Sequence, residues 1–358
     1  MLGDRAMFLQ NAWYVWGWGH EIATGGPPVG RVVVGHPIVI WRSDAGVIHA
    51  AEDRCPHRHA ALSKGRVDGD RLVCMYHGMA FGGDGRCMGM PLVEKTPDVR
   101  LRTYPVVESD DWVWIWPGDP AKADPMLIPK AFGIRNPDRP MRSNSIEYNA
   151  NYRLLHDNLC DLSHVDYVHE TTLRQASGAY WAQSKPRVTS QPRAIRFERW
   201  FEQADMPGAP GQKVDSWIAY DFHVPGIFIL HGARFPLGTA ARCNYGPPPA
   251  DIEPLVQNIE QQAVTPVSSN RTAYHYATGL IGDSPEMTLK LAQRMDVVMA
   301  AFEEDREMIE AQQAIHDLTD PAVPMFFVPQ DQGPFLMRKL MNRLIREERN
   351  QADSLAAC

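Results

Sequence analysis

Two short segments in the first third of the chain each combine one cysteine with one histidine. The first segment supplies Cys55 and His57, the second supplies Cys74 and His77, and residues 58–73 separate the two pairs. Thiolate and imidazole groups both bind metals, so together the segments offer four ligands to one metal centre. A structural zinc finger usually places two cysteines in one segment and two histidines in the other. The mixed pairs therefore favour a different centre, with structural zinc as the alternative.

A [2Fe-2S] cluster of the Rieske type accounts for such mixed pairs. One of its irons binds two thiolates and the other binds two imidazoles, so each segment can supply one ligand to each iron. Imidazole ligands also raise the reduction potential, which suits a relay of single electrons. We therefore predict that Cys55, His57, Cys74 and His77 hold the cluster. His59 is predicted not to bind, because the set of four ligands is already complete.

A second group of possible metal ligands lies near the middle of the chain. Asn158, Asp161 and His164 are spaced by three residues, which places them on one face of a helix. Because His169 lies about 140° further round an ideal helix than His164, the helix must bend or end if both are to reach one metal. Two imidazoles and one carboxylate form the ligand set of non-haem Fe(II) oxygenases. We predict a mononuclear iron bound by His164 and His169, with Asn158 beside the ligands.

The carboxylate ligand is expected on a long helix from about residue 285 to 315. The apolar face of this helix is formed by Val298, Ala301, Phe302, Met308 and Ile309. Asp305 lies on that face, whereas Glu304 lies largely off it. A buried acid is costly unless it is paired or bound to metal, which favours Asp305 as the third ligand. The alternatives are a solvated acidic helix for Asp305 and core positions for the two histidines.

The segments that carry the two sites differ in their patterns. Residues 1–120 alternate apolar and polar side chains between Gly, Pro and Asp turns, which predicts an all-β domain. Three prolines within residues 116–125 interrupt this pattern and indicate a boundary near residue 120. The remainder mixes the two element types and predicts an α+β fold overall. We expect helices over 152–169, 285–315 and 335–349, and strands over 194–201, 216–231 and 271–278.

The composition restricts the compartment and the partners. The chain has 358 residues with 36 Lys and Arg against 43 Asp and Glu, a net charge of -7. This balance argues against nucleic acid or an anionic membrane as the main partner. Asp4 and Arg5 stand where a signal peptide needs apolar residues, and no stretch matches the roughly 18 apolar residues of a membrane span, so a cytoplasmic protein is expected. In a reducing compartment the remaining cysteines are expected to be free thiols: Cys87, Cys160, Cys243 and Cys358.

The motifs resemble those of the oxygenase (alpha) components of Rieske non-haem iron aromatic ring-hydroxylating oxygenases, in the branch of vanillate O-demethylase and dicamba monooxygenase. The resemblance covers nearly the whole chain and rests on Asn11-Ala-Trp-Tyr-Val, Cys55-Pro-His-Arg, Cys74-Met-Tyr-His-Gly, Trp114-Ile-Trp-Pro-Gly-Asp, Asp157-Asn-Leu-Cys-Asp161-Leu-Ser-His164 and Glu304-Asp305. It implies a Rieske domain over residues 1–120. A catalytic domain of the helix-grip type (Bet v1/START-like), with an antiparallel sheet, would occupy residues 121–358.

The resemblance also implies how the two metal centres work together. Relatives form head-to-tail homotrimers in which the cluster of one subunit faces the mononuclear iron of its neighbour. An acid at the position of Asp161 then connects His77 to His164 across the subunit interface. Electrons from NAD(P)H would arrive through a separate reductase or ferredoxin.

The implied reaction is a monooxygenation with O₂. It oxidises the methyl group of a methoxylated aromatic compound, expected to be an aromatic acid, and releases a phenol and formaldehyde. Hydroxylation of an aryl methyl group and N-demethylation use the same iron chemistry and are alternatives. An electron-transfer protein without its own catalysis is an alternative of another class.

Two further histidines are predicted to contact the substrate. His275 matches a position that contacts substrate in dicamba-type relatives, and His231 ends an apolar strand segment. Each could form a hydrogen bond to a carboxylate or phenol within an otherwise apolar pocket. A strand histidine that bonds only its neighbours is the alternative for each. Phe222 and Phe228 are expected in the core, with a place in the pocket wall as the alternative.

Overall fold

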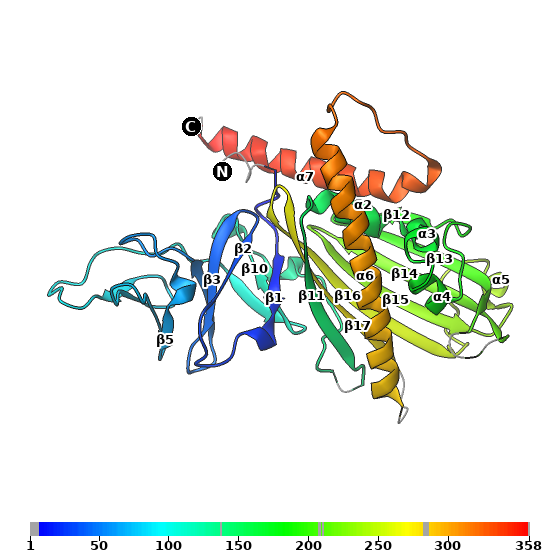
Figure 1. Cartoon of the computed structure of the whole chain (residues 1–358), viewed down its shortest axis with the longest axis horizontal. Helices are drawn as coiled ribbons and strands as arrows, with labels where there is room; N and C mark the ends of the chain where they lie inside the picture. The colour runs from blue at the N-terminus through cyan, green and yellow to red at the C-terminus, as the bar shows by residue number, and fades with distance from the viewer. Residues whose placement is uncertain (1–6, 137, 207–208, 210, 282–285, 357–358) are drawn as a thin grey trace. The chain divides into compact units, whose positions relative to one another are not determined.

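The computed structural model describes residues 7–136, 138–206, 209, 211–281 and 286–356 (Figure 1). The chain folds into two compact units. The first contains the residues up to 129 together with 265–268 and those from 348 onward, and the second contains 130–264 and 269–347. The expected boundary near residue 120 stays a prediction, because these units are defined by packing and draw on separate parts of the chain.

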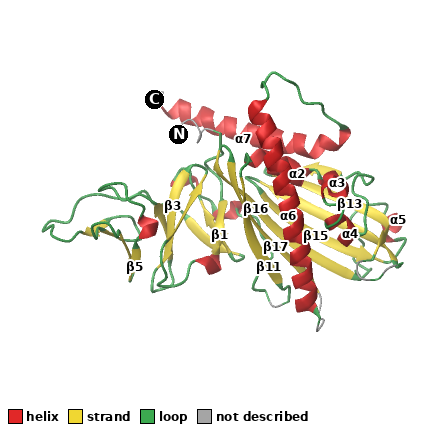
Figure 2. Cartoon of the chain, in the orientation of Figure 1, coloured by secondary structure: helices red, strands yellow, loops and turns green. Residues whose placement is uncertain are grey.

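The first unit is built from small antiparallel sheets (Figure 2). Their strand orders are β1-β10-β9, β2-β3-β4 and β5-β6-β7-β8. The strands are β1 (Tyr14–Trp18), β2 (Val29–Val33), β3 (His36–Arg42), β4 (Ile48–Glu52), β5 (Arg66–Asp68), β6 (Arg71–Val73), β7 (Ala80–Phe81), β8 (Cys87–Gly89), β9 (Val106–Ser109) and β10 (Trp112–Ile115). The described residues of this unit also form the 3-10 helices η1 (Gly19–Glu21), η2 (Leu62–Lys64), η3 (Pro120–Lys122) and η4 (Pro125–Leu127). The sheets confirm the all-β character predicted for the N-terminal part.

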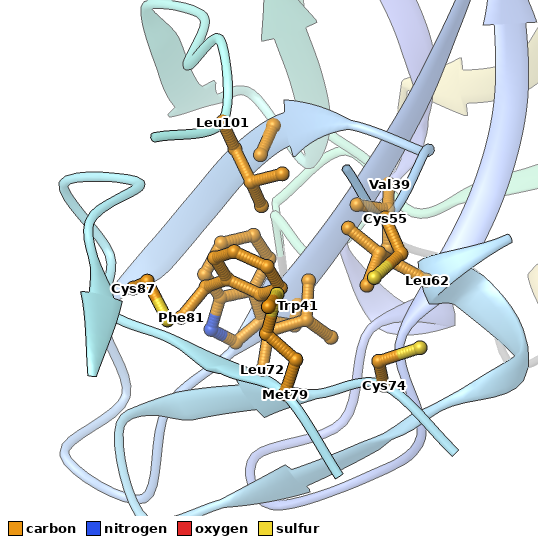
Figure 3. Close-up of a cluster of buried hydrophobic side chains, with 11 residues drawn as sticks. Val39, Trp41, Cys55, Leu62, Leu72, Cys74, Met79, Phe81, Cys87 and Leu101 are labelled. Atoms are coloured by element: carbon orange, nitrogen blue, oxygen red, sulfur yellow. The ribbon is translucent and has the colours of Figure 1, made fainter. Parts of the chain in front are cut away.

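A hydrophobic cluster anchors the sheet β5–β8. Its buried members are Val39, Trp41, Ala51, Cys55, Leu62, Leu72, Cys74, Met79, Phe81, Cys87 and Leu101. Figure 3 shows Cys55 and Cys74 at one side of this cluster and Cys87 at the other. Because packed apolar side chains resist displacement, the cluster fixes the start of both loops that carry the predicted iron–sulfur ligands.

The second unit contains a seven-stranded antiparallel sheet. The strand order is β11-β17-β16-β15-β14-β13-β12. The strands are β11 (Met141–Tyr148), β12 (Arg187–Ser190), β13 (Ala194–Asp205), β14 (Lys213–His223), β15 (Ile227–Phe235), β16 (Val256–Ser268) and β17 (Arg271–Ile281). The single strand expected over 216–231 is wrong, because Val224, Pro225 and Gly226 form a turn between β14 and β15. Proline cannot donate a ladder hydrogen bond, which explains why the strand ends there.

Helices complete the second unit. They are α2 (Tyr152–Cys160), η5 (Leu162–His164), α3 (Val165–Val168), α4 (Leu173–Ser177), α5 (Thr239–Arg242), α6 (Met287–Leu318), η6 (Pro329–Asp331) and α7 (Gln332–Ala356), of which the residues from 348 onward are counted with the first unit. Helix α6 packs across β11 and β17 (Figure 2), and the Phe302 ring contacts those of Tyr274 and Tyr276. This antiparallel sheet with helices confirms the α+β class. None of the described helices is both long and apolar enough to span a membrane.

Several expectations for individual side chains can be compared with this unit. Asp305 is 3% exposed and lies on the buried face of α6, as predicted, whereas Met308 is 56% exposed and was wrongly assigned to that face. Pro285, where the helix was expected to begin, lies outside the described residues. The described cysteines outside the predicted cluster are free thiols, namely Cys87, Cys160 and Cys243, and Cys358 lies outside the described residues.

Candidate metal centres

The loops that carry Cys55 and Cys74 each contain a backbone turn, and the two turns have the same conformation. In the first loop the His59 N–H donates to the Cys55 carbonyl at 2.8 Å, and in the second the Gly78 N–H donates to the Cys74 carbonyl at 2.9 Å. His59 and Gly78 both have a left-handed backbone, with φ of 56° and 76°. The two loops are therefore matched in conformation, and each presents one thiol and one imidazole.

The four predicted cluster ligands lie together at the tips of these loops. Cys55 and Cys74 are each 2% exposed, whereas His57 is exposed and His77 is half-buried. The centroids of the two imidazole rings are 4.7 Å apart. Burial raises the pKa of the Cys55 thiol, and the nearby Cys74 thiol raises it further. Two buried thiolates therefore require positive charge beside them, and the irons of a [2Fe-2S] cluster held by these four residues would supply it.

His59 occupies a backbone position that suits glycine. Its side chain is exposed, and its Nε2 lies 3.3 Å from Nη1 of Arg54. The equivalent residue of the other loop is Gly78, which has no side chain to offer a metal. The loop geometry thus supports the prediction that His59 does not bind the cluster.

Substitutions at the two equivalent positions should have unequal effects. His59→Gly is expected to change the free energy of unfolding by less than about 1 kcal/mol, because relief of the left-handed conformation offsets the greater freedom of glycine in the unfolded chain. Gly78→Ala is expected to destabilise the protein by about 1–2 kcal/mol. A Cβ atom at residue 78 would lie 2.8 Å from Cγ of Pro91. Denaturation curves measure both effects, and loss of cluster absorbance in His59→Gly would contradict its exclusion as a ligand.

The chain between α2 and α3 breaks at Asp161. This residue has an extended backbone, and its carboxylate accepts a hydrogen bond from the Ser163 N–H at 2.9 Å, which caps η5. The continuous helix expected over 152–169 is therefore wrong at Asp161, although the end expected before His169 is found. The break brings the rings of His164 and His169 to a centroid distance of 5.2 Å.

His164, His169 and Asp305 converge on one point of the second unit. Their possible ligand atoms all lie within 4.8 Å of one another. The Asp305 carboxylate lies 3.6 Å from Nε2 of His164 and 3.3 Å from Nε2 of His169. Burial lowers the pKa of His164; at His169 burial acts in the same direction, but the carboxylates of Asp305 and Glu304 outweigh it and raise the pKa. Two imidazoles and a buried carboxylate match the donor set of a non-haem iron site.

Each histidine presents Nε2 because its Nδ1 is engaged elsewhere. Nδ1 of His164 lies 2.7 Å from the backbone carbonyl oxygen of Asp161. Nδ1 of His169 lies 2.8 Å from the Glu304 carboxylate. A histidine that binds metal normally donates its other N–H to such an acceptor, which fixes the orientation of the ring. Both rings are therefore held ready to bind a metal through Nε2.

Hydrogen bonds also position the two carboxylates. The Asn158 amide donates to Asp305 at 2.8 Å, and the Thr172 hydroxyl donates to Glu304 at 2.7 Å. The sequence reasoning placed Asn158 beside the ligands but did not find Thr172 or the contact of Glu304 with His169. The position of Glu304 next to Asp305 was the available signal, since residues adjacent on a helix can contact two sides of one site.

A cavity of about 120 Å³ opens beside these three residues. Its volume is near the roughly 150 Å³ of an engineered cavity that binds benzene, so one aromatic ring fits. Apolar side chains form much of the wall, among them Leu159, Leu162, Ile218, Phe228, Leu230 and Phe302. The charged residues that line it, besides Asp305, are Arg234, Glu260 and Arg294. Phe228, expected in the core, is buried and also lines the cavity, whereas Phe222 is a core residue.

His231 and His275, which were predicted to contact the substrate, lie outside this cavity. Neither residue lines the cavity. His231 bonds the Gln257 side chain at 2.9 Å, and His275 bonds the Ser145 hydroxyl at 2.8 Å. Side chains alternate along a strand, so His231 faces away from the cavity that its neighbour Leu230 lines.

Comparisons with known proteins agree with both centres. Residues 12–105 match the family model of the Rieske [2Fe-2S] domain, and residues 148–347 match that of the vanillate O-demethylase oxygenase C-terminal domain. The iron–sulfur subunit of the toluene-4-sulfonate monooxygenase system of Comamonas testosteroni is 34% identical over 96% of this chain and 98% of its own length. The vanillate O-demethylase oxygenase subunit of a Pseudomonas strain is 30% identical over 97% and 98%.

Solved structures show the same likeness. A crystal structure of dicamba monooxygenase bound to 3,6-dichlorosalicylic acid has a TM-score of 0.84 at 27% identity, covering 96% of this chain and 99% of that one. The chain belongs to the Rieske non-haem iron oxygenases that carry the vanillate O-demethylase type of C-terminal domain. Its cofactors are accordingly a Rieske [2Fe-2S] cluster and a mononuclear non-haem iron.

Proposed function

We propose that this protein is the oxygenase component of a monooxygenase that demethylates a methoxylated aromatic acid. The overall reaction consumes the aryl methyl ether, O₂, two electrons and two protons, and it releases a phenol, formaldehyde and water. The observation that carries this proposal is the convergence of His164, His169 and Asp305 beside a cavity the size of one aromatic ring. The vanillate and dicamba O-demethylase relatives support the choice of a methyl ether.

The ligands of both cofactors are part of the proposal. Cys55, His57, Cys74 and His77 would hold the cluster. The iron of the second centre would be bound by Nε2 of His164, Nε2 of His169 and the Asp305 carboxylate. With both groups bound, the protein gains a store for single electrons and a centre that activates O₂ for attack on a C–H bond.

The surrounding residues have distinct tasks in this scheme. Phe228, Leu230 and Phe302 enclose the aromatic ring and exclude water from the reacting methyl group. Hydrogen bonds from the two imidazole Nδ1–H groups to the Asp161 carbonyl and the Glu304 carboxylate keep both rings aimed at one point. An iron held by only these three residues would be able to bind O₂ next to the substrate.

The path of electrons and the assembly extend the proposal beyond one chain. Electrons from NAD(P)H would reach the cluster through a reductase or ferredoxin. In a head-to-tail homotrimer in the cytoplasm, Asp161 would connect the cluster of the neighbouring subunit to His164. The hydrogen bond between the Asp161 backbone carbonyl and His164 supports this assignment, because it holds residue 161 next to a predicted iron ligand.

Oxidation of an aryl methyl group is a second candidate function. The toluene-4-sulfonate monooxygenase relative favours it, since that protein is 34% identical over nearly the whole chain. The same centre would then convert the methyl group into a hydroxymethyl group and release no formaldehyde.

Turnover with a surrogate reductase distinguishes the candidates. The purified protein is supplied with NADH, reductase and either 4-methoxybenzoate, toluene-4-sulfonate or a neutral N-methyl compound, and O₂ uptake and formaldehyde are measured. Demethylation predicts one formaldehyde for each O₂ consumed in the presence of the methoxy acid. Coupled O₂ uptake only with toluene-4-sulfonate, without formaldehyde, would replace the proposal by methyl hydroxylation.

A further inference from the structure

The cavity beside the predicted iron site contains a buried arginine that has no acidic partner among the described residues. Arg234 is 7% exposed, and its Nε is buried without a hydrogen bond in the part of the chain that the structure describes. Its only side-chain bond there runs from Nη1 to the Asn258 side-chain oxygen at 3.2 Å. Burial, together with the positive charge of Arg294, lowers the pKa of Arg234 to about 10, so the side chain remains charged at neutral pH.

The other charged groups of the cavity are already compensated. Glu260 accepts hydrogen bonds from Arg294 at 2.5 Å and from Gln262 at 2.9 Å. Asp305 faces the two histidines that would share a metal ion with it. Among the charged groups that line the cavity, the Arg234 guanidinium therefore remains without a counter-charge. A buried charge without a partner is costly, and a ligand that supplies the opposite charge would offset this cost.

The strands around Arg234 direct its side chain into the cavity. Phe228, Leu230 and Arg234 are separated by even numbers of residues on β15, so they share the face that lines the cavity. Gly232, on the same face, lies opposite Asn258 on β16. A Cβ atom at residue 232 would lie 2.5 Å from the Asn258 side-chain oxygen. The missing side chain at Gly232 thus gives Asn258 the space from which it holds the Arg234 guanidinium.

We propose that Arg234 binds the anionic group of the aromatic substrate, a carboxylate or a sulfonate, and so selects acids over neutral aromatics. A guanidinium offers a planar set of N–H donors that matches two oxygens of either group. The apolar residues Phe228 and Leu230 continue from Arg234 along the same strand face and would contact the ring. This inference rests on the proposed function and adds to it the residue that defines the substrate class.

A binding experiment with matched ligands tests the inference separately from catalysis. The affinities of the holoenzyme for 4-methoxybenzoate, toluene-4-sulfonate and the neutral 4-methoxybenzamide are measured by calorimetry without O₂ or reductant. Arg234→Met is expected to weaken binding of the acids by about 10–100-fold, as for the loss of charge-assisted hydrogen bonds, and binding of the amide by less than about 3-fold. Arg234→Lys should fall between, because it keeps the charge but loses the planar donor set.

Arg196 provides a matched control on the same sheet. It belongs to β13, does not line the cavity and pairs with Asp221 at 2.7 Å. Arg196→Met removes one positive charge without altering the proposed binding site, so the ratio of acid to amide affinities should stay that of the wild type. Arg234→Met should also fold with unchanged or higher thermal stability, since an unpaired buried charge is replaced by an apolar side chain.

The outcomes separate the inference from the proposed function. An equal loss for acids and amide in Arg234→Met, or unchanged affinity for both acids, would overturn the inference. A loss confined to one acid would support it and identify the group that is bound. If the acids bind through Arg234 but none of the methoxy compounds yields formaldehyde, the anion site stands and the demethylation proposal fails.

Discussion

Asp305→Ala is expected to lose the mononuclear iron while the Rieske cluster remains. Iron content should fall from about three atoms per chain to about two, because the cluster ligands are unaffected. The Asp305 carboxylate faces Nε2 of both His164 and His169, so its removal leaves two neutral ligands at a site designed for three. Iron analysis, visible absorption and turnover measure the three consequences. Full iron content with normal product formation would exclude Asp305 as a ligand.

Glu304 supplies the control for this prediction. It is adjacent to Asp305 but contacts His169 on the Nδ1 side, away from the point where the ligand atoms converge. In Glu304→Gln the amide oxygen can still accept the His169 and Thr172 hydrogen bonds. We expect a decrease in iron affinity of at most about 10–100-fold, the usual effect of changing a residue that supports a ligand, and a restored site at high iron concentration. Equal losses in both variants would show that the two acids had been assigned wrongly.

Asp161→Asn is expected to retain both metal centres and to lose turnover by about 100-fold, at the upper end for a residue that supports a ligand. Asparagine caps helices as well as aspartate, so the bond to the Ser163 N–H that shapes the turn can persist. The backbone carbonyl that holds His164 is unchanged as well. The substitution therefore removes the negative charge of the proposed electron path and little else.

The rate of cluster oxidation measures this effect directly. The prereduced protein is mixed with substrate and O₂, and the cluster absorbance is followed. In the wild type the cluster should be reoxidised within one turnover, whereas in Asp161→Asn it should stay reduced. Asp161→Ala, which loses the cap too, shows how much of any effect comes from the turn alone. Rapid reoxidation with normal product in Asp161→Asn would contradict the proposed path.

The metal centres could be predicted mainly from which ligand residues occur in the sequence and how they are spaced. The Cys-x-His and Cys-x-x-His pairs, together with Asp305 on an apolar helix face, depend on local sequence alone, and the structure brings each set together. The break at Asp161 was missed because an aspartate within a helical pattern gives no sign of whether it will cap a new turn or continue the helix. The capping bond to Ser163 decides between these conformations in the folded chain.

The cavity could not be derived in the same way. From the sequence alone, Arg234 resembles a solvated charge at the end of a strand. Only the folded structure shows that β15, β16 and α6 enclose it. The structure places His231 and His275 outside the cavity lining because side chains alternate along a strand. On β15 the side chains of Phe228 and Leu230 line the cavity, so that of His231 faces the other side of the sheet. On β17 the rings of Tyr274 and Tyr276 contact Phe302 of α6, so His275 faces away from α6.

The position of Arg234 has a consequence for the end of the catalytic cycle. The anionic group that it would bind takes no part in the reaction, so the phenolic product keeps the same group. Substrate and product then differ only at the methyl carbon beside the iron, and the guanidinium holds both of them. The demethylated acid would therefore compete with fresh substrate for the cavity, and turnover would slow as the product accumulates.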